Sequence, residues 1–245
     1  VSGVGDVDLH LWRERSKEGD NVFSGTIDAQ RVNAGLIANA RKVVGSLDLN
    51  ADLMAYVPKK GNVELTMKGS ANQAELLGHS LNEVMLIGDL KENRFMGSLS
   101  VDDQVLALNF NGLIDFNDKK YPVANFEAEV DHADLKALGL MKNDSLSEIS
   151  TNIVARLKGF NIDDLEGELY LDNTVYRDGR GVYQMIDFDA TLLNDNLMQR
   201  RINITCDFFN FEMAGQMNFA SLMRVLNEYA DSFVHFPKFE TNRED

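Results

Sequence analysis

Histidine and cysteine, the side chains that most often bind metals or do nucleophilic chemistry, are scarce in this 245-residue sequence. The four histidines stand far apart, and none has a second metal-binding residue at the spacing typical of a zinc site. They are His10, His79, His132 and His235. We therefore expect neither a metal site nor a cofactor.

Other groups that could do chemistry have simpler explanations. Gly78-His79-Ser80 suggests a nucleophilic serine, but the Gly-x-Ser-x-Gly pattern is absent and a turn explains it better. Asp163-Asp164 and the pair Asp187 and Asp189 could act as carboxylate dyads or ion ligands. Alternation of polar and apolar residues instead places them on solvated strand faces. With no phosphate-binding loop or dinucleotide fingerprint, the sequence predicts no enzyme.

Composition narrows the class of partner. The 39 acidic and 24 basic residues give a net charge of −15, which opposes binding to nucleic acid.

The single cysteine, Cys206, cannot form an internal disulfide and is flanked by Ile204 and Phe208, so we expect it to be buried. No apolar run is long enough to span a membrane, and no signal segment precedes Val1. We expect the chain to be a piece of a longer protein.

The elements that would position any site are strands with one apolar face. In Phe110-Asn-Gly-Leu-Ile-Asp-Phe116, alternate residues point to opposite faces, and Gly112 lies on the apolar one. The same apolar-x-Gly-x-apolar phrase recurs at Phe23–Ile27, Met67–Ala71, Leu86–Leu90, Phe95–Leu99, Leu165–Leu169 and Met213–Met217. Glycine on that face lets a strand bend or lets another backbone come close.

Short polar loops join these strands, so neighbouring strands should be antiparallel. Two helices are also expected: Ala133–Leu140, capped by Asp131, and one starting after Asn218, which would cover one end of the sheet. Residues 30–44 fit a short helix or an irregular strand. The apolar face changes parity near Phe208-Phe209, which predicts a bulge or break there.

The predicted fold is mainly β: a long, strongly curved antiparallel meander, either an open groove or closed into a barrel or sandwich. We treat residues 1–245 as one segment, with a subdivision into 1–141 and 142–245 left open. An amphipathic sheet of this length must cover its apolar face with its own chain or with a ligand. The residues predicted to line that face are Leu47, Leu49, Leu53, Val63, Leu65, Met67, Leu106, Leu108, Phe110, Ile114, Phe126 and Val130.

One stretch resembles a known family. Ala124–Leu140, an alternating strand that runs into Ala133-Asp-Leu-Lys-Ala-Leu138, is similar to the strand-to-helix element of the AsmA/TamB envelope proteins of Gram-negative bacteria. Ile153–Tyr176, with Asp163-Asp-Leu-Glu-Gly167, resembles the part that follows. The resemblance covers roughly residues 95–220 and contains no catalytic residue.

The resemblance implies a partly open β structure with an apolar inner surface, in a periplasmic protein anchored in the inner membrane outside this segment. Its partners would be phospholipid acyl chains or hydrophobic segments of outer-membrane proteins, neighbouring segments of the same chain, and an outer-membrane assembly protein. The function expected is lipid transport or outer-membrane biogenesis. The alternative is a structural or adhesive β-sandwich module with a closed core and no ligand.

Overall fold

The computed structural model describes residues 5–16, 19–33, 44–76, 78–118, 120–141, 146–159, 163–194 and 199–216. All regular elements in these ranges are strands, and they belong to one 14-stranded antiparallel sheet. The strands are β1 (Asp6–Arg15), β2 (Asn21–Asn33), β3 (Val44–Val57), β4 (Glu64–Leu76), β5 (His79–Leu81), β6 (Val84–Lys91), β7 (Arg94–Asp102), β8 (Leu106–Asp115), β9 (Val123–Asp134), β10 (Ser147–Lys158), β11 (Glu166–Asp178), β12 (Val182–Asn194), β13 (Arg200–Cys206) and β14 (Asn210–Gly215).

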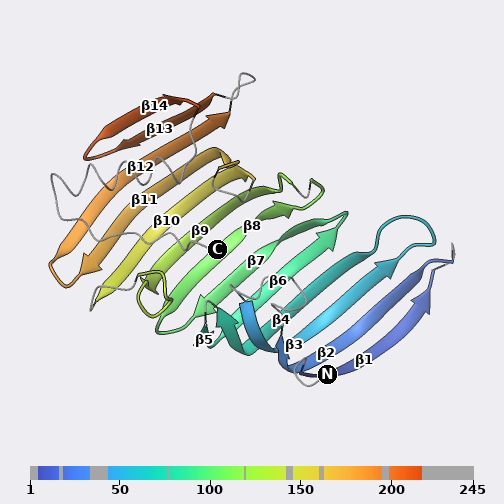
Figure 1. Ribbon diagram of the computed structural model, residues 1–245. Coiled ribbons are helices and arrows are strands. Elements are labelled where there is room, and N and C mark those ends of the chain that lie inside the picture. Colours follow the sequence, from blue (N-terminus) through green and yellow to red (C-terminus); the bar gives the residue numbers. More distant parts are fainter. Residues whose placement is uncertain are drawn as a thin grey trace, which may run out of the picture.

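The topology is a meander in which spatial order follows sequence order. Each strand from β1 to β14 pairs with the next, except that β4 pairs with β6 and the short β5 pairs only with β4. β1 and β14 form the two edges, and the sheet does not close on itself (Figure 1). The predicted antiparallel sheet is therefore confirmed, and in the described ranges it is open. These ranges contain no helix long and apolar enough to cross a membrane.

The helix predicted at Ala133–Leu140 is wrong. β9 continues through Asp134 because Ala133 pairs with Leu106 on one side and with Ile149 on the other. A turn follows, in which the Asp134 carboxylate, rather than that of Asp131, accepts the backbone N–H groups of Lys136 and Ala137. Pairing on both sides outweighs the local helical pattern.

Other local predictions have different outcomes. The parity change near Phe208-Phe209 is confirmed as a break, since β13 ends at Cys206 and β14 starts at Asn210. Of the Gly78-His-Ser80 segment, expected to be a turn, only Gly78 is a turn residue, while His79 and Ser80 belong to β5. The helix after Asn218 and most of residues 30–44 lie outside the described residues.

The main cluster of buried side chains lies at one end of strands β4 to β9. β5 and the turn after β9 supply Leu81 and Leu138, which are 2% and 4% exposed. They pack with Ala71, Val84, Val101, Leu106 and Ala133. These two short segments therefore cover one end of the apolar face.

Candidate functional site

The candidate site is the apolar face of the sheet, which strand register makes continuous. Directly paired residues in an antiparallel sheet point to the same face, so each chain of pairs defines a row across it. We call the first the Phe110 row; it consists of Leu9, Ile27, Ala51, Gly69, Leu86, Leu99, Phe110, Ala128, Ile153, Leu171, Phe188 and Cys206. No member carries a charge.

A second row runs parallel to the first. This Gly112 row consists of Leu11, Gly25, Leu53, Met67, Gly88, Gly97, Gly112, Phe126, Ala155, Leu169, Ala190, Ile204 and Phe211. It extends from β1 to β14 without a polar side chain. The next row, from Phe23 on β2 to Met213 on β14, is equally apolar.

The dimensions of this face follow from sheet geometry. Thirteen strands at a spacing of about 4.8 Å make it roughly 58 Å long. The three central rows make it about 13 Å wide at roughly 6.7 Å per two residues; the row through Leu108 and Val130 is left out because Val130 pairs with Thr151. The strip therefore covers roughly 780 Å² of the sheet.

The structure divides the twelve predicted lining residues into three groups. Leu53, Leu65, Met67, Phe110, Ile114 and Phe126 lie half-buried in the central rows, and Leu49 lies in the adjacent row. Leu106 belongs to the buried cluster, and Leu47, Leu108 and Val130 pack against it. Val63 directly precedes β4, is 52% exposed and lies outside the paired rows.

Two of the glycines on this face lie directly beside phenylalanine side chains. A Cβ at Gly112 would collide with the Cβ of Phe126 and lie 2.7 Å from the carbonyl oxygen of Asn125. The Phe126 ring packs against Phe110 with 5.3 Å between centroids, and a Cβ at Gly88 would meet the ring of Phe95. The rings thus cover the positions where glycine leaves no side chain.

The opposite face carries charged and polar side chains together with exposed apolar ones, among them Met54, Met85, Ile87 and Met96. One row on it runs through Ser98, Asn111 and Glu127, and the next through Ser100, Asn109 and Glu129. Between these two rows lies a shallow depression of about 580 Å³. Exposed ion pairs cross this face, and such pairs add little stability. The two faces therefore differ in charge, because the central rows of the first face carry no charged side chain.

One of these ion pairs has a clear electrostatic effect. The carboxylate of Asp115 accepts the backbone N–H of Asn117 at 2.9 Å and the Arg94 Nε at 2.6 Å. The Asn117 N–H, followed by the guanidinium, holds the pKa of Asp115 below its ordinary value.

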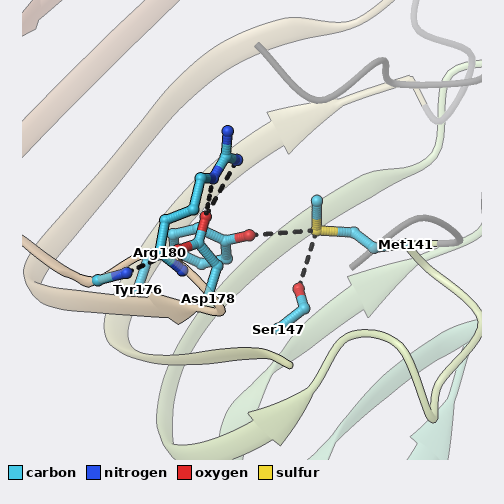
Figure 2. A network of polar contacts seen from close by, with 6 residues as sticks. Met141, Ser147, Tyr176, Asp178 and Arg180 are labelled. Carbon is cyan, nitrogen blue, oxygen red and sulfur yellow. Dashed lines mark hydrogen bonds and ion pairs between the residues drawn. The ribbon is translucent and has the colours of Figure 1, made fainter. Parts of the chain in front are cut away.

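The apolar face becomes polar at one corner, beyond a register shift. The Thr151 and Thr174 hydroxyls are 2.7 Å apart there. Figure 2 shows the neighbouring network, in which the hydroxyls of Ser147 and Tyr176 donate to the Met141 sulfur at 3.0 and 3.8 Å. This corner marks where the apolar rows end.

Asp178 forms the other half of this network. Burial raises its pKa, but the N–H groups of Arg180 and Gly181 outweigh that effect and hold the pKa below its ordinary value. The Arg180 guanidinium also bonds to the carboxylate at 3.1 Å. The carboxylate is fully engaged in holding the turn between β11 and β12.

The side chains first considered for chemistry do not come together. His10 and His132 lie on β1 and β9, and His79 lies on β5; His235 lies outside the described residues. Asp187 and Asp189 point to the polar face, and the carbonyl of Asp163 accepts a hydrogen bond from Arg200. In the described ranges, no three histidine, cysteine or carboxylate side chains converge as metal ligands.

Sequence reasoning missed two features of this surface. β5 could have been found only from its pairing with β4, because three residues carry no periodic signal. The parity change predicted the break at Phe208-Phe209, but it did not show that both side chains are exposed at a hairpin tip. Comparison of the chain with protein-family models, curated proteins and solved structures finds no match.

Proposed function

We propose that this chain is a periplasmic, non-enzymatic segment of an AsmA/TamB-like protein, and that its apolar face carries phospholipid acyl chains. The observation that supports this most is the continuity of the Gly112 row from β1 to β14, flanked by two apolar rows that each span twelve strands. An acyl chain needs a surface free of polar interruptions, because each unpaired polar group meeting a methylene chain costs free energy.

The close approach at Gly112 supports a curved sheet. Strands that converge on one face bend the sheet around that face, and glycine is the residue that allows such a bend. The apolar face then becomes the inside of a groove, with the acidic face outside. Hydrophobic segments of outer-membrane proteins are a second cargo for the same groove, delivered to an outer-membrane assembly protein.

A photocrosslinking experiment identifies what contacts each of the two faces of the sheet. Benzoylphenylalanine replaces Phe110 on the apolar face, and the matched control replaces Asn111, the next residue, on the polar face. Crosslinking is done in intact cells on the full chain, and the adducts are identified by mass spectrometry. We expect phospholipid adducts at position 110 and none at position 111.

Other outcomes discriminate between the alternatives. Adducts with outer-membrane proteins at position 110 would favour protein assembly over lipid transport. Adducts only within the same chain would refute an open groove and favour the structural or adhesive module with a closed core. Phe110 is chosen over Leu108 because Leu108 packs against the buried cluster and is less free to report a ligand.

A further inference from the structure

Several large apolar side chains are exposed at one rim of the sheet near its β14 edge. Phe208 and Phe209, at the tip of the β13–β14 hairpin, are 69% and 53% exposed. Ile186 on the neighbouring strand is 64% exposed. Val182 and Tyr183, at the start of β12 on the same rim, are exposed to a similar degree. We call these five residues the aromatic rim.

The hairpin tip is held in place although its side chains are exposed. The backbone N–H of Cys206 donates to the carbonyl of Phe209 at 3.0 Å, which closes the turn. The Asp207 carboxylate accepts the N–H of Ile186 at 2.5 Å, which fastens the tip to β12. Binding through this tip therefore costs little ordering entropy, because the backbone is already fixed.

The aromatic rim adjoins the apolar face. The Phe110 row ends in the pair Phe188 and Cys206, one residue before the tip begins. A chain leaving the apolar face at this end would pass directly beside Phe208. We propose that the aromatic rim inserts into the interface of a zwitterionic phospholipid bilayer. Only the role of this contact in lipid exchange rests on the proposed function.

Shape and charge favour a membrane over other partners. A hairpin tip with two adjacent phenylalanines is convex and small, whereas a stable protein interface needs about 1,000 Å² or more. Aromatic side chains are the residues enriched at the membrane–water interface. Asp187 and Asp207 stand beside the tip and the net charge is −15, so attraction to anionic lipids is not expected. Binding should therefore be insensitive to salt.

The first experiment uses the full chain and vesicles of pure phosphatidylcholine. Flotation compares the wild type with a Phe208→Ser/Phe209→Ser variant, and circular dichroism confirms that both are folded. We expect the variant to partition at least ~10-fold more weakly, since removal of two interfacial aromatic side chains lowers the buried apolar area. Equal flotation of the two proteins would overturn the inference.

A second measurement locates the contact. Phe208→Trp is made in a Trp12→Phe background, so that the only indole stands at the tip; Trp12 of the wild type, on β1, is the control. Brominated phosphatidylcholine should quench the indole at position 208 and leave Trp12 unquenched. Equal quenching at both positions, or none at 208, would overturn the inference. Neither outcome affects the Phe110 crosslink, which tests the proposed function separately.

Discussion

Gly112→Ala tests whether close strand approach on the apolar face is a structural requirement. An alanine Cβ at this position would lie 2.7 Å from the Asn125 carbonyl oxygen and 2.8 Å from the Phe126 Cα, and would collide with the Phe126 Cβ. These are fixed atoms of the neighbouring strand, so rotation of a side chain cannot relieve the contact. Overpacking of this kind costs about 1–3 kcal/mol.

Gly181→Ala is the matched control. A Cβ there meets nothing closer than the Tyr183 hydroxyl at 3.8 Å, and its φ is not in the left-handed region. Both substitutions restrict the unfolded chain alike, which by itself stabilises by about 0.4–1 kcal/mol. The difference between the variants therefore isolates the clash, at about 2 kcal/mol.

Thermal unfolding followed by circular dichroism measures that difference. For a chain of this size, about 2 kcal/mol corresponds to a Tm roughly 4–8 °C lower for Gly112→Ala than for Gly181→Ala. If the two variants melt within about one degree of each other, the sheet tolerates a side chain at Gly112. The glycine argument for a curved groove would then fail.

Two further predictions concern polar contacts. Arg200 is 3% exposed and donates to the carbonyls of Asp163 at 2.8 Å and Leu165 at 3.1 Å. Arg200→Ala should therefore lower the free energy of unfolding, measured by urea titration, by about 3 kcal/mol. A change under about 0.5 kcal/mol would contradict this prediction. The Asn117 N–H holds the pKa of Asp115 below the ordinary 3.8. The Asp115 carboxylate therefore stabilises the folded chain above pH 3.8, and this stabilisation is lost as the pH falls through the lowered pKa. The Tm difference between wild type and Asp115→Asn should therefore shrink on acidification, and a constant difference would refute this account.

The sheet was predictable from sequence because alternation and turn chemistry agree along most of the chain. Leu86–Leu90 and Phe95–Leu99, for example, each show period-two alternation and are separated by a short polar loop, and they form the neighbouring strands β6 and β7. The placement of glycine on the apolar face follows from the same alternation. Register then brings Gly88, Gly97 and Gly112 into one row, which no single strand pattern could show.

The errors have a common physical cause. Ala133–Leu140 has local helical spacing, but Ala133 and Asp134 gain strand pairing with β8 and β10, which local spacing does not reveal. Leu106 and Leu108 fit the lining pattern, yet β5 and the turn after β9 cover that end of the face. Alternation identifies the face on which a residue lies, while contacts distant in sequence determine what covers it.

The absence of polar side chains from the central rows bears on the choice between a lipid groove and a closed protein core. A closed core tolerates polar groups when they are paired, as Thr151 and Thr174 are at the corner of this sheet. A surface along which an acyl chain moves cannot use such pairs, because the moving methylene groups would lie against polar groups that they cannot satisfy. The Gly112 row runs from Leu11 to Phe211 without one polar side chain, and the hydroxyl pair lies beyond its border. The acyl-chain path proposed above requires this exclusion of polar groups, whereas packing of a closed core does not.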